Sequence, residues 1–167
     1  MNAMDADMLR IFQGMPIFGG LSDDTVGFLI ERARPVRIAA GGHFFHEGDL
    51  ADSMFVLESG HVAVSRLWNG RPVAVRRLGP GDCFGEMALM DFHPRSASVV
   101  ALDDCEALEL GTAGLMALFE VNAEQFALVQ MNMGREVCRR LRASDARLFA
   151  AEMAAADAAH LLHPPAT

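Results

Sequence analysis

The residues best suited to chemistry in this sequence lie close together, between positions 84 and 99. Gly85 lets the backbone turn and approach a ligand closely. Glu86 and the three residues after it favour a single helical turn, whose free N–H groups attract an anion and phosphate above all. Arg95 carries a planar fork of donors that suits phosphate oxygens. These residue types at this spacing predict an anion-binding segment.

Short side chains follow the arginine. Ser96 and Ser98 add hydroxyl groups, and the small Ala97 leaves room for backbone donors. Taken singly, Glu86 and Arg95 would each be ordinary charged groups at the protein surface. It is their combination with the glycine that indicates a ligand site.

Three zones with different hydrophobic patterns must position this segment. Residues 4–34 look helical, with an interruption at Met15-Pro16 and a second helix capped by Ser22. From 35 to 111, short runs of alternating apolar residues recur between turn signals, and Asn69-Gly70 predicts a hairpin. The predicted strands are Val36–Ile38, Met54–Leu57, His61–Arg66, Val73–Leu78, a strand ending at Phe84, Ser98–Ala101 and Ala107–Leu110.

The helical period returns from 112 to 157. A short helix comes first, and Asn122 can cap a second, much longer one. The fold class predicted is mainly β with flanking α: a small antiparallel, jelly-roll-like β-roll with N-terminal helices and a long C-terminal helix. We expect residues 1–159 to form one domain and 160–167 a flexible tail. The long helix carries a narrow apolar stripe, made of Phe126, Val129, Met133, Val137, Leu141 and Leu148.

Composition narrows the classes of function. The formal net charge is −8, so nucleic acid is not the expected partner. No run approaches about 18 apolar residues and the N-terminus is acidic, so we expect a cytoplasmic protein without a membrane span or signal peptide. The cysteines Cys83, Cys105 and Cys138 are far apart and are expected to be small buried hydrophobic residues rather than a disulfide or zinc site.

The run FGEMAL followed by PRSASV resembles the phosphate-binding cassette of cyclic-nucleotide-binding domains, which occur in bacterial catabolite activators, kinases and gated channels. The resemblance covers roughly residues 10–150 and implies a ligand-binding sensor rather than an enzyme. Other stretches that match the family pattern are Gly41 with Phe45 and Glu47-Gly48-Asp49, Met54-Phe55-Val56-Leu57, Ser59-Gly60-His61-Val62, and Leu78 with Gly81-Asp82.

The resemblance implies a role for each matching residue in residues 84–98. Glu86 would accept a hydrogen bond from the ribose 2′-hydroxyl, and Arg95 would pair with the exocyclic oxygens of the cyclic phosphate. The implied ligand is cAMP or cGMP, without a metal. Ser96 does not decide between the two bases, and cAMP is favoured. The full predicted site comprises Phe84, Gly85, Glu86, Met87, Ala88, Arg95, Ser96 and Ala97, with Arg135, Ser144 and Asp145 as candidate base contacts.

The signal is expected to leave through the long helix. The ligand would favour the state in which that helix covers the pocket, and the helix could also form a homodimer. We expect only about twenty residues to remain after the helix, too few for a DNA-binding fold. We therefore expect no direct DNA binding and an unknown protein partner for the output.

Two alternatives remain. One is a ligand-free scaffold that uses the same fold to oligomerise. The other is a cupin-like metal-dependent jelly roll built on His43, His46, Glu47 and His61. Because His43 and His46 are three apart, a strand is expected to point them to opposite faces, which disfavours a shared metal.

Overall fold

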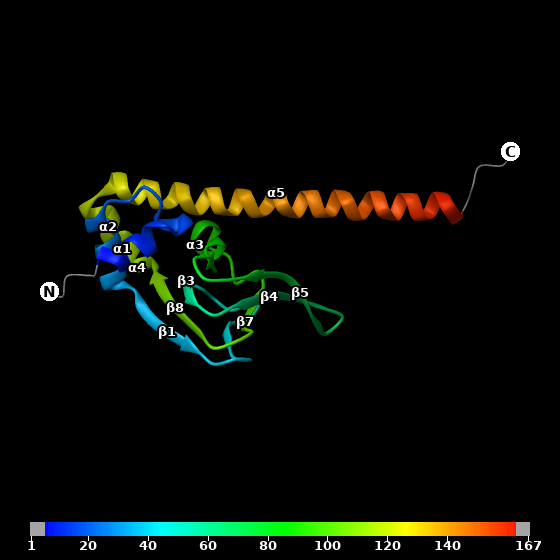
Figure 1. Cartoon of the computed structure of the whole chain (residues 1–167), viewed down its shortest axis with the longest axis horizontal. Coiled ribbons are helices and arrows are strands. Elements are labelled where there is room, and N and C mark those ends of the chain that lie inside the picture. Colours follow the sequence, from blue (N-terminus) through cyan, green and yellow to red (C-terminus); the bar gives the residue numbers. More distant parts are fainter. Residues whose placement is uncertain (1–5, 163–167) are drawn as a thin grey trace. The chain divides into compact units, whose positions relative to one another are not determined.

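The computed structural model describes residues 6–162, which form two four-stranded sheets and a set of helices (Figure 1). The chain divides into two compact units between Met133 and Gly134, and each unit is described by itself. In chain order the elements are α1 (Ala6–Gln13), the 3-10 helix η1 (Pro16–Phe18), α2 (Asp23–Arg32), β1 (Arg34–Ile38), β2 (His43–Phe45), β3 (Ser53–Ser59), β4 (Val62–Trp68), β5 (Arg71–Leu78), β6 (Cys83–Phe84), α3 (Met87–Asp91), β7 (Ser98–Ala101), β8 (Cys105–Gly111), α4 (Thr112–Val121) and α5 (Ala123–Leu162).

The two sheets form the predicted antiparallel β-roll. One has the strand order β1-β8-β3-β6 and the other β2-β7-β4-β5. The hairpin between β4 and β5 turns at Asn69-Gly70, where both residues have positive φ angles of 50° and 74°. Two consecutive positive φ angles are what a two-residue hairpin turn requires, which is why this sequence signal was reliable.

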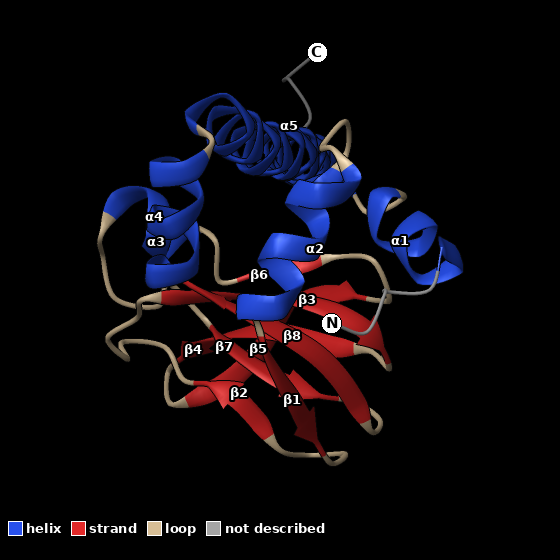
Figure 2. Cartoon of the chain, turned by 90° about the vertical axis from the view of Figure 1, so that its left-hand side faces the viewer, coloured by secondary structure: helices blue, strands red, loops and turns tan. Residues whose placement is uncertain are grey.

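The strand β3 is buried on both faces and separates two apolar cores. Met54 and Val56 pack into the cluster formed with the helices, whereas Phe55 and Leu57 pack into the cluster between the two sheets. Successive side chains of a strand point to opposite faces, so one strand contributes to both cores. Figure 2 shows the helices α2 and α4 on one side of the red strands.

Side-chain hydrogen bonds fix the ends of the helices as the sequence predicted. Ser22 Oγ accepts from Thr25 N at 3.3 Å at the start of α2, and Asn122 Oδ1 accepts from Gln125 N at 3.1 Å at the start of α5. The first part of α5 is also held by a buried side chain. Asn132, only 5% exposed, donates from Nδ2 to Ile17 O at 3.1 Å and to the carbonyl of Gly19 at 2.9 Å.

Some details differ from the sequence analysis. The short strand β2 was absent from the predicted set of strands, although His43 and His46 were expected to lie on a strand. Its three residues carry too little alternation for a pattern to define its bounds. The helix α5 continues to Leu162, where we expected it to end near 157 and a tail to begin at 160; residues 163–167 lie outside the described residues. Cys83 and Cys105 are buried as expected, but Cys138 is exposed. Among the described residues, no helix is both long and apolar enough to cross a bilayer.

Candidate functional site: a buried arginine in the β6–β7 connection

The segment between β6 and β7 has the local structure that its sequence predicted. The strand β6 ends at Phe84, Gly85 turns the chain with a φ of +83°, and the short helix α3 follows from Met87. The chain then returns through Pro94 to β7. We call residues 84–98 the cassette.

Arg95 is the buried charge at the centre of the cassette. Its side chain is only 6% exposed, and its guanidinium is held by acceptors from two other segments. Nη1 donates to the carbonyl of Ser53 at 2.7 Å and to the carbonyl of Gly85 at 2.9 Å, and Nη2 donates to Ser53 Oγ at 3.3 Å. The protein therefore engages both terminal nitrogens.

The Nε–H group of Arg95 is buried and has no hydrogen-bond partner among the residues that the structure describes. Leaving a buried donor unsatisfied costs about 1–3 kcal/mol, and more when the group is charged. Nη2 also keeps a second proton after its bond to Ser53. Nε and Nη2 share one edge of the guanidinium plane, and such an edge can bind two oxygens of a single phosphate.

Gly85 is required for this placement of the arginine. A Cβ atom at this position would lie 2.5 Å from Arg95 Nη1 and 3.4 Å from Phe45 Cε1. Its φ of +83° also lies in the region that L-residues with a side chain rarely adopt. The glycine thus serves both the turn and the close approach of the arginine to the backbone.

A cluster of phenylalanine rings packs against the Arg95 side chain. The guanidinium carbon of Arg95 lies 4.0 Å from the centre of the Phe45 ring, within the range of a cation–π interaction. Phe55 and Phe84 stack at 5.4 Å beside it. Burial lowers the pKa of the Arg95 guanidinium, and nearby carboxylates, above all that of Glu109, oppose this effect. An arginine remains protonated under such conditions, so the buried group is a cation.

The other predicted cassette residues fall into a buried group and an exposed group. Glu86 is 2% exposed at the start of α3, and the small side chains of Ala88 and Ala97 are also buried. Met87 and Ser96 face outward, with Ser96 Oγ 3.9 Å from Met87 Sδ. A buried carboxylate is expensive unless polar groups satisfy it, so Glu86 is not the ordinary surface residue that its type alone would suggest.

The three candidate base contacts lie outside this unit. Arg135, Ser144 and Asp145 belong to the second unit, on α5, and all three are exposed. Ser144 Oγ donates to the backbone carbonyl of Arg140 at 3.0 Å within the helix. Their contact with a base stays a prediction.

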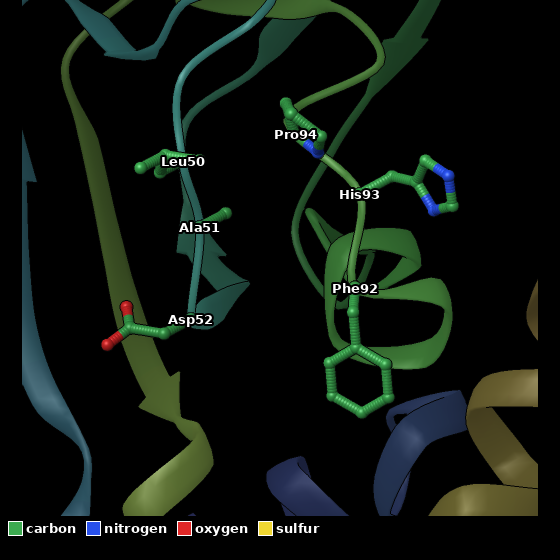
Figure 3. Close-up of a pocket in the computed structure, with 6 residues that line it drawn as sticks. All are labelled: Leu50, Ala51, Asp52, Phe92, His93 and Pro94. Carbon is green, nitrogen blue, oxygen red and sulfur yellow. The ribbon is translucent and has the colours of Figure 1, made fainter.

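Sequence reasoning missed two residues that hold the arginine, Ser53 and Glu109. Both line a pocket of about 530 Å³ that also contains Arg95 and the side chains of β1 and β2. A second pocket, of about 400 Å³, lies between residues 50–52 and residues 92–94; Figure 3 shows these two segments running side by side. No short-range pattern links Ser53 to Glu109, because they are 56 positions apart and meet only through the pairing of β3 with β8.

The geometric premise used against the cupin-like alternative, that His43 and His46 point to opposite faces, was wrong. The rings of His43 and His46 stack at 4.4 Å, on the same side, because the register of β2 shifts before Phe45 and His46 lies beyond the strand. The other two candidates already have partners: Glu47 pairs with Arg66, and His61 with Asp103. In the part of the chain that the structure describes, no three histidine, cysteine or carboxylate side chains gather as a metal site would require.

Comparisons of sequence and of structure find known proteins that share this fold. The chain is 34% identical over 137 residues to a cyclic AMP receptor protein of Thermus thermophilus, covering 81% of this chain and 62% of that protein. A cyclic nucleotide-binding domain from Methylobacillus flagellatus superposes with a TM-score of 0.76 at 25% identity, over 84% of this chain and 80% of the other. The regulatory domain of Toxoplasma gondii PKA, in a co-crystal structure with cAMP, gives a TM-score of 0.62 at 29% identity and covers 69% and 46%.

The chain spans about three-fifths of the length of the bacterial receptor that it matches. The likeness therefore concerns one domain of that protein. The model of the cyclic nucleotide-binding domain matches residues 35–122, a stretch that contains the whole cassette and, except for Arg34 of β1, both sheets. This chain belongs to the cyclic nucleotide-binding domain family.

Proposed function

We propose that this protein is a sensor whose cassette binds a cyclic nucleotide, most specifically cAMP. The observation that carries the proposal is Arg95: a buried cation with one edge, Nε and Nη2, not fully engaged by the protein. A cyclic phosphate offers one negative charge and two exocyclic oxygens, which match that edge in number and sign. We assign no catalytic step to the site.

The remaining cassette residues fit the other parts of a nucleotide. Glu86 would accept a hydrogen bond from the ribose 2′-hydroxyl, which is a suitable donor for a buried carboxylate. Ala88 and Ala97 leave space for the sugar and phosphate, and Ser96 supplies an exposed hydroxyl. The proposed roles require no metal.

The preference for cAMP rests on the relatives. The Thermus protein is named for cyclic AMP, and the Toxoplasma domain was crystallised with it. The base would be read by residues outside the cassette, with Arg135, Ser144 and Asp145 as candidates. cGMP is the competing ligand, and the titration below compares the two.

We propose that α5 carries the signal, through a homodimer and to a protein partner in the cytoplasm. The apolar stripe of this helix changes character along its length. Val129 and Met133 are buried within the first unit, whereas Leu141 and Leu148 are each 59% exposed in the second. Leu141 and Leu148 are seven residues apart, the spacing at which a second helix packs in a coiled coil. The exposed part is therefore the candidate surface for a second copy of this chain.

Isothermal titration of ligand-stripped protein with cAMP and cGMP tests the proposed function. We expect cAMP to bind with a Kd of about 1 µM or tighter and cGMP to bind more weakly. Arg95→Ala should weaken binding at least about a hundredfold, because two hydrogen bonds to a charged group are lost. Arg71→Ala, which removes an exposed arginine from the tip of the β4–β5 hairpin, is the charge-matched control and should bind as the wild type does. Binding of neither nucleotide would contradict the sensor and favour the scaffold.

Gly85→Ala should damage binding more than stability. The added methyl group displaces the Arg95 guanidinium from its place 2.5 Å away, so we expect cAMP affinity to fall by about tenfold or more. Gly41→Ala is a close match, since Gly41 has a φ of +82° and no atom within 4 Å of its Cβ position. Both variants should lose about 1 kcal/mol of unfolding free energy through the strained φ, and Gly85→Ala should lose more because the displaced guanidinium gives up hydrogen bonds. Equal nucleotide affinities in the two variants would show that Gly85 does not act through the arginine.

Ligand should reduce hydrogen exchange in α5. If cAMP shifts the population toward a state in which this helix covers the ligand, amides of residues 123–150 should exchange more slowly at saturation. Amides of the β4–β5 hairpin tip, which are outside the proposed pathway, provide the internal reference. Exchange in α5 that is the same with and without bound nucleotide would remove the helix from the mechanism.

Sedimentation should detect the proposed dimer and its dependence on the exposed stripe. Leu148→Glu places a charge in the apolar interface and should shift the protein toward the monomer. Ala146→Glu adds the same charge on a different face of α5 and should leave the dimer intact. A wild-type protein that sediments as a monomer at all accessible concentrations would rule out this use of the helix.

A further inference from the structure

The arginine of the cassette is held by residues from outside the cassette. Ser53, the first residue of β3, is 6% exposed and offers Arg95 two acceptors, its carbonyl oxygen and its hydroxyl. These two bonds use the end of the guanidinium formed by Nη1 and Nη2. The edge formed by Nε and Nη2 is thereby left for a ligand.

The hydroxyl of Ser53 has one proton, and this proton is donated in a hydrogen bond to Glu109. Ser53 Oγ donates to Glu109 Oε1 at 2.7 Å. A hydroxyl that donates in one direction presents its lone pairs in the others, so this bond directs an acceptor toward Arg95. Glu109 thus fixes the direction of the Ser53 O–H bond and leaves the lone pairs of Ser53 Oγ free to accept from the guanidinium.

Glu109 is itself fixed from the opposite side by Arg34. These two residues are paired in register across β1 and β8, and Arg34 Nε donates to Glu109 Oε2 at 2.7 Å. Each oxygen of the carboxylate therefore has its own partner. The Glu109 side chain is only 18% exposed, whereas that of Arg34 is 73% exposed.

We propose that Glu109 and Ser53 form a positioning relay that presents the free edge of Arg95 to the cyclic phosphate. The inference rests on the proposed function and adds to it two positioning residues, which act through the arginine. In the absence of the relay the guanidinium can rotate about its side-chain bonds, and part of the binding free energy must then be used to fix it.

Charge and position must be separated in the test. Removing the negative charge of Glu109 would also make the electrostatic potential at the ligand more positive. This change would favour binding of an anion and would mask a loss of positioning. Glu109→Asp keeps the charge and withdraws the carboxylate from Ser53 by one methylene group. Glu106→Asp is the matched control, because Glu106 lies on the same strand and makes the equivalent cross-strand pair with Arg37 at 2.8 Å.

The experiment titrates the full chain with cAMP and cGMP and measures thermal unfolding of each variant. Glu109→Asp and Ser53→Ala should each weaken nucleotide binding about tenfold, the effect of one hydrogen bond to a charged group. The double variant should bind no more than about twofold more weakly than Ser53→Ala, because Glu109 acts through the serine. Glu106→Asp should leave the affinity unchanged.

Three outcomes would overturn the relay. The first is wild-type affinity in Glu109→Asp, and the second is an additive loss of about a hundredfold in the double variant, which would mean independent effects. The third is an equal loss of affinity in Glu106→Asp, which would show a general loss of sheet stability. If the wild-type protein binds neither nucleotide, the proposed function itself fails. If the wild-type protein binds and the variants bind equally well, only the relay fails.

Discussion

A guanidinium placed among phenylalanine rings must have its charge balanced and its donors satisfied, and this requirement accounts for the arrangement around Arg95. The protein supplies carbonyl oxygens from Ser53 and Gly85, the Ser53 hydroxyl and the face of the Phe45 ring. Each of these contacts constrains another element. Gly85 must lack a side chain, β3 begins at Ser53, and the chain enters β7 at Ser98, shortly after the arginine.

The arginine is held strongly but not completely. A site in which every donor was used would be more stable and could not bind an anion without breaking a bond. Here the buried Nε–H group has no partner within residues 6–162, so a phosphate would add an interaction instead of exchanging one. This difference favours ligand binding over a purely structural role for the cassette.

The sequence predicted most of the strands and helices because their signals are local. The positive φ angles at Asn69-Gly70, the capping side chains of Ser22 and Asn122, and the turn at Gly85 each depend on residues only a few positions apart. The cassette residues were found for the same reason, since they lie within fifteen positions of one another. Their chemical roles came from the family resemblance and remain proposals.

Contacts between distant segments could not be found in this way. The bond from Ser53 to Glu109 depends on the register of β3 and β8, and the stacking of His43 on His46 depends on a register shift in β2. The exposure of Leu141 and Leu148 was equally hidden, because an apolar stripe has the same sequence pattern whether it packs on its own unit or on a second copy.

The most direct measurement of the central claim is the ¹H–¹⁵N resonance of the Arg95 Nε–H group, identified by its absence in Arg95→Lys. We expect saturating cAMP to move this proton resonance downfield and to slow its exchange with solvent, because a phosphate oxygen accepts its hydrogen bond. If cAMP binds and the resonance stays where it is in the free protein, the ligand does not use this edge of the arginine. The proposed site would then be wrong.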